Sequence, residues 1–442
     1  MAMMRKKGKY LLGGLVFVFL CWFLVNWQNS LNLLPSQVED SSLDVSVREV
    51  TTVPPKIRRE HSSSENRKCP SLSGMTEGRW VVRPLNETEQ MMIDTYLKEA
   101  RGAYKIPPTF QREDGRCGDV TYSNVTLHKH MWFRAICDPR GATPCCHTNS
   151  CQLLAQEDCR CPTCLDERQA VHAEFAHWQP TDDRCPVMEF NADRACQLLE
   201  GMSLYFVGDS FIRHMFAALV IILTNEVNGA MKEDIPRDIK GRCLGHNQIT
   251  AEVCRAYLDP DRVLCHGKVK VQYVEMFSVA DLPVIHQLLV DLRQSGSSLV
   301  VLGLGIHDNF NPTVVSKKFL HPFLNLRQHL STNISSAFLQ TDPAPGLDLT
   351  RLRPGILWVG AHAPGLLKSP RFPQQSADGV QHYNSEISHV LKRWGVPVLD
   401  TFSFSNGTVS FDGTHYGWGI NKLKANMLMT YIRTSFWGDG RK

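Results

Sequence analysis

The chain has 442 residues, of which 43% are hydrophobic and 21% are charged. This length allows two or three domains with a full hydrophobic core, and the composition excludes disorder, collagen and coiled coil as descriptions of the whole chain. The net charge is only +4, and four cations fall within the first nine residues, so the rest of the chain is close to neutral. A nucleic-acid-binding domain carries clustered basic charge, so we expect no nucleic-acid partner.

An uncharged apolar stretch, YLLGGLVFVFLCWFLVNW, follows the basic N-terminus at residues 10–27. A transmembrane helix needs about 20 mostly apolar residues, and Tyr10, Trp22 and Trp27 are typical of membrane interfaces. We therefore predict a cytoplasmic tail over 1–9, a single-pass signal anchor and a luminal remainder. A cleaved signal peptide is the alternative, which a long apolar region and the absence of a small-residue cleavage site disfavour.

Fourteen cysteines lie outside the apolar stretch, which indicates an oxidising compartment. The clusters CCHTNSC (145–151) and CRCPTC (159–164) predict disulfides, with zinc binding as the alternative. Eleven of the cysteines lie between Cys69 and Cys196 and three lie later, so if all pair, at least one bridge joins the two groups. Sequons, which are typical of a glycosylated luminal protein, occur at four asparagines: Asn86, Asn124, Asn333 and Asn406.

The remaining chain divides into a stem, a cysteine-rich module and an α/β body. Residues 28–67 have little apolar periodicity and read as a solvated stem, and residues 68–198 read as a loop-rich module with a helix near 87–100. Residues 199–442 alternate apolar strands with helices, which predicts a three-layer α/β/α domain around a mostly parallel sheet. The predicted strands are 203–207, 269–276, 298–305, 356–362 and 397–402, and the predicted helices are 211–226, 281–294, 315–330, 382–394 and 417–436.

Ser210 lies where the first predicted strand gives way to a helix, in FVGDSFIRHMF. Gly208 permits a sharp turn before it, and Arg213, three residues later, lies on the same side of the helix. A hydroxyl at a helix N-terminus lies beside N–H groups that can stabilise an oxyanion, so Ser210 is a candidate nucleophile. The alternative is that Ser210 caps the helix.

A serine nucleophile needs a base, and FDGTHYGWG near the C-terminus places Asp412 and His415 three residues apart. At this spacing the carboxylate can accept from one imidazole nitrogen while the other takes the serine proton. A capping Asp and a surface His are the alternative. Elsewhere, His307 after the third strand is a candidate oxyanion donor, and His362 after the fourth is a candidate substrate contact.

Metal and nucleotide sites have weaker support. There is no P-loop, and GLGIHD lacks the third glycine of a dinucleotide motif. His128 and His130 have no third ligand nearby. Asp259 and Asp261 could hold a divalent cation for a glycosyltransferase, but they lie between cysteines in an expected insertion. We predict no bound metal and no bound cofactor.

These motifs resemble the SGNH/GDSL-like hydrolase superfamily. The closer resemblance is to its PC-esterase branch, which includes the plant trichome-birefringence-like polysaccharide O-acetyltransferases. The residues that carry it are GDSFIR (208–213), FDGTHYG (411–417) and the segment KCPSLSGMTEGRWVV (68–82), which is similar to the Cys…Gly-x-Trp-Val entry of the plant proteins.

The resemblance implies a triad of Ser210, His415 and Asp412 that works through an acyl-serine, with Arg213 near the oxyanion or substrate. The chain departs from the pattern at His307, which stands where the hydrolases have Asn. Two further positions differ. Gly245 is only a candidate for the second-block glycine, and Tyr416 stands where the plant proteins have Trp.

The predicted protein is therefore a Golgi, single-pass type II enzyme that transfers an acyl group, most simply acetyl, onto a glycan hydroxyl. A glycan O-acetylesterase and a non-catalytic glycan-binding or scaffold protein are the alternatives. The expected partners are a glycan acceptor, a membrane crossed by one helix, and an acyl donor such as acetyl-CoA as cosubstrate. Because one helix cannot import a cytosolic donor, a donor-supplying transporter is expected too.

Overall fold

The computed structural model describes residues 69, 72–103, 105–127, 131–245, 247–293, 295, 297–332, 341–344, 346–349 and 352–436. The predicted anchor and stem, His128, His130 and the sequon at Asn333 lie outside these ranges. Among the helices that are described, none is both long and apolar enough to span a bilayer. Residues 65–442 form one compact unit.

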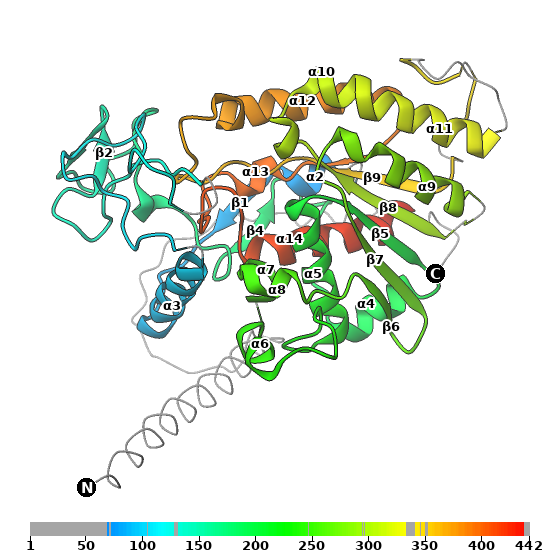
Figure 1. Ribbon diagram of the computed structural model, residues 1–442, viewed down its shortest axis with the longest axis horizontal. Coiled ribbons are helices and arrows are strands. Elements are labelled where there is room, and N and C mark those ends of the chain that lie inside the picture. The colour runs from blue at the N-terminus through cyan, green and yellow to red at the C-terminus, as the bar shows by residue number, and fades with distance from the viewer. Residues whose placement is uncertain are drawn as a thin grey trace, which may run out of the picture. The chain divides into compact units, whose positions relative to one another are not determined.

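One six-stranded sheet forms the centre of this unit (Figure 1). Its strands are β5 (Ser203–Gly208), β6 (Asp261–Leu264), β7 (Val269–Glu275), β8 (Ser298–Gly303), β9 (Gly355–Val359) and β10 (Val398–Leu399). Across the sheet the order is β10-β9-β8-β5-β7-β6, and every neighbouring pair is parallel except β6 with β7. All residues of β8 and β9 are buried, as expected of strands covered on both faces.

Helices cover both faces of the sheet, as Figure 1 shows. Successive residues of β5 point to opposite faces, so that Phe206 joins one apolar cluster and Val207 joins the other. The first cluster packs against α4 (Ala192–Leu199), α5 (Ser210–Thr224) and α14 (Trp418–Tyr431). The second packs against α9 (Leu282–Leu292), α10 (Pro312–Val315), α11 (His321–Thr332) and α12 (Ala377–Arg393).

The predicted α/β class with a mostly parallel sheet is confirmed. Each of the five predicted strands lies in the sheet, and each predicted helix is present. The prediction missed the antiparallel edge strand β6. The last strand is shorter than predicted, because only Val398 and Leu399 pair with β9. Two residues later, the hydroxyl of Thr401 donates to the Gly360 carbonyl. The predicted helix 315–330 starts earlier and contains a π-helical turn over Ser316–Leu320.

The smaller elements belong mostly to the cysteine-rich segment and to the connection between α5 and β6. In the cysteine-rich segment, β1 pairs antiparallel with β4, and β2 with β3. These elements are α2 (Ser73–Thr76), β1 (Gly78–Val81), α3 (Glu87–Ala103), β2 (Cys145–His147), β3 (Ser150–Gln152), β4 (His177–Pro180), α6 (Arg237–Arg242), α7 (Asn247–Thr250), α8 (Glu252–Arg255) and α13 (Phe402–Ser405).

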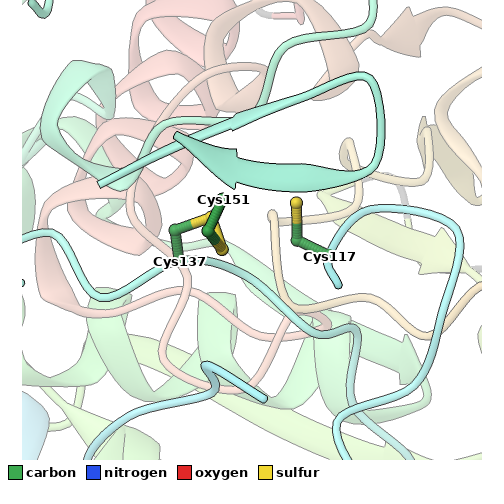
Figure 2. A group of neighbouring side chains, drawn as sticks. All are labelled: Cys117, Cys137 and Cys151. Carbon is green, nitrogen blue, oxygen red and sulfur yellow. A yellow bond between two sulfur atoms is a disulfide. The ribbon is translucent and has the colours of Figure 1, made fainter. Parts of the chain in front are cut away.

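Seven disulfides pair the fourteen cysteines from Cys69 to Cys265. Figure 2 shows one crowded group, in which Cys137 is bonded to Cys151 while the sulfur of Cys117, bonded to Cys146, lies close by. The predicted disulfides in the two clusters are confirmed, and thiolate zinc sites are wrong for them, because each sulfur is bonded to another sulfur. The pairs are 69–185, 117–146, 137–151, 145–159, 161–164, 196–265 and 243–254.

One bridge, Cys196–Cys265, joins the early and late groups of cysteines, as their number requires. It fastens α4, which the sequence assigned to the cysteine-rich module but which packs on α5 in the α/β body, to the turn after β6. The cysteine-rich segment is attached to the body by other contacts. Val171 exchanges backbone hydrogen bonds with the strand-like stretch 407–409, and the N–H of Arg134 donates to the Leu367 carbonyl. These contacts place the segment beside the loops that follow β9 and β10.

Candidate active site

The candidate site lies at the carboxyl end of β5, where the sheet order changes direction. In chain order the parallel strands are β5, β7, β8, β9 and β10, so β5 lies between the second and third of them. Connections leave β5 and β8 toward opposite edges of the sheet, and such a switch point opens a crevice at the carboxyl ends of the strands. Ser210 follows β5 at this point, and His307 follows β8.

Local backbone geometry sets the position of Ser210. Gly208 ends β5 with a φ of 154°, and a Cβ there would collide with the Gly303 carbonyl of the neighbouring strand, so only glycine fits. Asp209 is the N-cap of α5, and its carboxylate accepts from the Phe211 N–H at 2.9 Å. The cap is therefore Asp209, and Ser210 is the first helical residue, whose N–H has no acceptor within the helix.

A tight turn before α14 supplies the base. The carboxylate of Asp412 accepts from the backbone N–H groups of Thr414 and His415, at 2.8 and 2.7 Å, which closes the turn. Its other oxygen accepts from Nδ1 of the His415 ring at 2.7 Å. Gly413, with a φ of 80°, has the left-handed conformation that the turn needs.

The structure brings the two motifs together in one hydrogen-bonded chain. Ser210 Oγ lies 2.8 Å from His415 Nε2, although 205 positions separate the two residues. Since Nδ1 donates to Asp412, Nε2 carries the lone pair and the Ser210 hydroxyl donates to it. Ser210, His415 and Asp412 are thus arranged as a nucleophile, its base and the group that orients the base.

The side chains of this hydrogen-bonded group differ in how deeply they are buried. The Asp412 side chain is 1% exposed and that of His415 is 21% exposed, so a substrate can reach the imidazole and the serine but not the carboxylate. Burial by itself would raise the pKa of Asp412, but the charge and hydrogen bonds of His415 outweigh it and lower that pKa. Asp412 is therefore ionised and can stabilise the imidazolium that forms when His415 takes a proton.

A second group of buried polar side chains holds the turn from behind. His362 Nε2 donates to the Thr414 carbonyl at 2.6 Å, and Lys424 Nζ donates to His362 Nδ1 at 3.0 Å. Lys368 Nζ donates to the Thr414 hydroxyl at 2.9 Å. Burial lowers the pKa of Lys424 to about 7 and that of Lys368 to about 8. Three basic side chains thus fix the residue that precedes His415.

This arrangement corrects the prediction for His362. Its ring is 4% exposed and stacks on Phe211 with the ring centroids 3.7 Å apart, so it does not contact substrate. Both ring nitrogens are occupied, by the Thr414 carbonyl and by Lys424. His362 is therefore a structural support of the catalytic turn.

Asp209 and His214 complete the buried polar group under the nucleophile. Asp209 is 1% exposed, and one of its carboxylate oxygens has no hydrogen-bond partner among the described residues. Burial raises the pKa of Asp209 to about 6. Burial, followed by the charge of Arg213, lowers the pKa of His214 well below its usual value, so this imidazole is neutral beside the His415 ring at 5.1 Å.

Arg213 lies one turn along α5 from Ser210, with its side chain 13% exposed. Its guanidinium is 3.9 Å from Glu275, at the end of β7, and 3.4 Å from the His214 ring. Glu275 also pairs with Arg255 at 2.6 Å. The guanidinium is therefore held by a carboxylate that it shares with a second arginine.

The loop after β7 does not contribute a free N–H to the site. There, the N–H groups of Phe277 and Ser278 both donate to Asp281, and that of Val279 donates to Asp308. Among the described residues of this loop, the N–H groups of Phe277, Ser278 and Val279 are therefore already engaged, whereas the N-terminus of α5 still offers the N–H of Ser210.

Gly245 differs from the sequence-based expectation, and the role of His307 stays a prediction. Gly245 lies between α6 and α7, ahead of β7, and its N–H donates to the Val227 carbonyl, so it does not offer a donor to an oxyanion. His307 keeps an exposed edge and packs edge-on against Phe277 with the ring centroids 5.1 Å apart. Partial burial, and after it the nearby His415, lower the pKa of His307.

The acidic pair proposed as a cation site is engaged otherwise. Asp259 pairs with Arg262 at 3.1 Å, and Asp261 lies in β6, 3.7 Å from Lys270. Both carboxylates are therefore neutralised by neighbouring basic side chains.

Three of the predicted glycosylation sites, at Asn86, Asn124 and Asn406, have exposed asparagine side chains.

Sequence reasoning missed Lys424 and Lys368. Lys424 could have been noticed, because it lies four residues after Ile420 and four before Leu428, on the apolar face of its helix. A cation on an apolar helical face needs a buried partner. Lys368 lies in a loop, KSPRF, whose pattern gives no such signal.

No family model matches the sequence, and no curated protein matches it either. Several solved structures match. An aryl esterase of M. smegmatis is 16% identical, over 52% of this chain and 98% of that chain, with a TM-score of 0.29. An acetylxylan esterase from Geobacillus stearothermophilus is 14% identical, over 55% and 99%, with a TM-score of 0.29.

An alpha/beta hydrolase from the metagenome of Lake Arreo, Spain, is 13% identical, over 53% and 96%, with a TM-score of 0.28. The chain is therefore similar to esterases and to an alpha/beta hydrolase. At these identities and TM-scores neither a fold nor an activity can be transferred, and the site is interpreted from its own geometry.

Proposed function

We propose that the chain is a serine-dependent acyl-transfer enzyme that works through an acyl ester on Ser210. One observation carries the proposal: hydrogen bonds run from Ser210 through His415 to the buried carboxylate of Asp412. Ser210 lies at the N-terminus of a helix and at the point where the order of strands in the sheet changes direction. A surface serine that merely caps a helix does not need a buried carboxylate two hydrogen bonds away. Here Asp209 is the cap.

In the first half-reaction, Ser210 Oγ attacks the acyl carbonyl of the donor while its proton moves to His415 Nε2. Negative charge develops on the carbonyl oxygen, where the Ser210 N–H and the Arg213 guanidinium can stabilise it. The bond to the leaving group then breaks, and His415 returns the proton to that group. The acyl group is left on Ser210, and His415 is again a neutral base.

In the second half-reaction, a hydroxyl gives its proton to His415 and attacks the acyl-serine carbonyl. The new ester forms as the bond to Ser210 Oγ breaks, and the serine recovers a proton. We propose that the acceptor is a hydroxyl of a glycan and the acyl group is acetyl, in a Golgi-type, membrane-anchored enzyme. This finer proposal is supported by the sequence motifs, the sequons and the anchor-like stretch. Water as the acceptor would make the same site an esterase.

The test follows the acyl group. Purified full chain, its Ser210→Ala variant and a matched Ser385→Ala variant on the exposed face of α12 are incubated with an activated acetyl ester. The peptide that contains Ser210 is then examined by mass spectrometry, before and after addition of glycan acceptors. We expect an acetyl group on wild type and S385A and none on S210A, with turnover of S210A lower by about three orders of magnitude or more.

The destination of the acetyl group separates the two activities. Acetyl on glycan supports transfer, and acetate alone supports an esterase. Turnover by S210A equal to that of wild type would overturn the acyl-serine mechanism. So would a folded, wild-type chain that carries no adduct and releases no acetate.

A further inference from the structure

A basic cavity lies between the cysteine-rich segment and the loop after β9. It has a volume of about 470 Å³. Its polar lining comes from Arg112, Arg116, Asp119, Thr121, Asn124 and Arg371. The first five belong to the cysteine-rich segment, and Arg371 belongs to the α/β body.

Positive charge exceeds negative charge around this cavity. Asp114 is held by Arg112 at 2.6 Å, and its single charge also faces Arg116. Asp119 faces Arg134, in the adjoining segment. Among the residues that line the cavity, three arginines stand against one carboxylate, that of Asp119. Arg116 and Arg371 are both exposed, and no carboxylate of the described ranges forms an ion pair with either of them.

An aromatic ring holds one of the arginines in place. The guanidinium carbon of Arg371 lies 3.8 Å from the centre of the Trp132 ring, which is a stacked cation–π arrangement. A stacked guanidinium keeps its edge N–H groups free for a planar anion, and arginine binds carboxylates and sulfate-like groups with paired hydrogen bonds.

Hydrogen bonds link the cysteine-rich segment to the loop after β9 and that loop to the turn of His415. The backbone N–H of Arg134 donates to the Leu367 carbonyl, and its side chain donates to the Lys368 carbonyl. Lys368 in turn donates to the hydroxyl of Thr414, next to His415. Arg371 is three residues from Lys368, so their Cα atoms are at most about 11 Å apart. The loop that carries Arg371 at the cavity is therefore the same loop that supports the turn of His415.

We propose that this cavity is a subsite for an acidic oligosaccharide, one that carries carboxylates or sulfates, and that it selects the acceptor. The role as acceptor site rests on the acyl-transfer function proposed above. Binding of the oligosaccharide can be measured without turnover. Arg116 and Arg371 contact the acidic groups, and Trp132 holds Arg371 in place.

The test measures affinity with the full chain carrying Ser210→Ala, so that no ligand is consumed. Any N-glycans are trimmed to the first sugar, because Asn124 lies in the lining. The probes are an oligogalacturonate, a sulfated glycosaminoglycan oligomer, a neutral xylo-oligosaccharide of equal length and a single-stranded oligonucleotide. Arg116→Gln/Arg371→Gln is compared with Arg293→Gln/Arg433→Gln, which removes two exposed charges elsewhere.

We expect at least one acidic oligosaccharide to bind and the neutral one to bind far more weakly. The R116Q/R371Q variant should lose roughly tenfold or more in affinity, whereas R293Q/R433Q should not. A preference between the uronate and the sulfated probe identifies the acidic group. With Ser210 intact, both double variants should turn over a small acetyl ester at the wild-type rate.

Two results would overturn the subsite. One is equal binding of acidic and neutral oligosaccharides, or unchanged affinity in R116Q/R371Q. The other is binding of the oligonucleotide as tight as that of the best glycan, which would show a general anion surface. Both results can be obtained while the acyl ester still forms on Ser210. If no acyl ester forms on Ser210, the binding measurements still stand. Failure of the subsite and failure of the proposed function are thus distinguishable.

Discussion

Lys424 gives the sharpest prediction, because a lysine that is 1% exposed must affect stability in a pH-dependent way. Burial lowers its pKa from 10.5 to about 7 in the folded chain, against which the charge of Asp209 acts only partly. In the unfolded chain its ordinary pKa applies. Between these two values the unfolded chain binds a proton that the folded chain does not, so this residue's contribution to stability rises with pH. Below about pH 7 Lys424 is protonated in both the folded and the unfolded chain, so the full free-energy cost of burying its charge is present.

The size of the effect follows from the two pKa values. A shift of one unit corresponds to about 1.4 kcal/mol, and integration from pH 7 to pH 9.5 gives a gain of about 3 kcal/mol for wild type. Lys424→Met lacks this titration and has a side chain of similar length. We therefore expect the stability difference between wild type and K424M to change by about 3 kcal/mol, in favour of wild type, on going from pH 7 to pH 9.5.

Urea unfolding, followed by tryptophan fluorescence at the two pH values, measures this difference. Lys422→Met is the matched control, since Lys422 lies on the same helix and pairs at the surface with Glu189 at 3.5 Å. K422M should show little of this pH dependence. If the difference between wild type and K424M stays constant to within about 0.5 kcal/mol, Lys424 is not held in the apolar environment that the structure describes.

Three further predictions concern the orienting carboxylate, one disulfide and metal ions. Asp412→Asn should lower kcat for an activated ester by about 10⁴-fold without changing the circular dichroism spectrum; a loss below about tenfold would contradict the triad. Replacing Cys196 and Cys265 together by serine opens a loop of 69 residues and should lower the free energy of unfolding by about 4 kcal/mol, measured with urea. A chelator should leave ester turnover unchanged, because Asp259 is paired with Arg262 and the clustered cysteines are in disulfides; chelator-sensitive turnover would contradict this.

The sequence predicted the parts of the site that depend on local pattern. A buried strand followed by a Gly-Asp-Ser turn and an apolar helix locates Ser210 at a strand end, since parallel strands in such sheets share that edge. The spacing of Asp412 and His415 indicated that the carboxylate can accept from one imidazole nitrogen, and the structure shows that this nitrogen is Nδ1. Both inferences use residues within about four positions of each other.

Contacts between distant segments could not be predicted in this way. Gly245 was chosen by residue type, but a long connection after α5 places it ahead of β7, with its N–H already bonded. His362 was chosen for its place at a strand end, and only the structure shows Lys424 and Thr414 on its two nitrogens. A periodic pattern shows which side of a helix is buried, but it does not identify the polar group that the helix packs against.

The geometry of the triad depends on residues that no substrate contacts. Ser210 begins α5 and His415 precedes α14, and these two helices pack against each other within one apolar cluster. Ala218 on α5 and Ala425 on α14 have no exposed surface. Because interiors are close-packed, a larger side chain at either alanine would have to move the helices apart or adopt a strained rotamer. Such a shift would lengthen the 2.8 Å hydrogen bond between Ser210 and His415, so packing between α5 and α14 positions the nucleophile and its base.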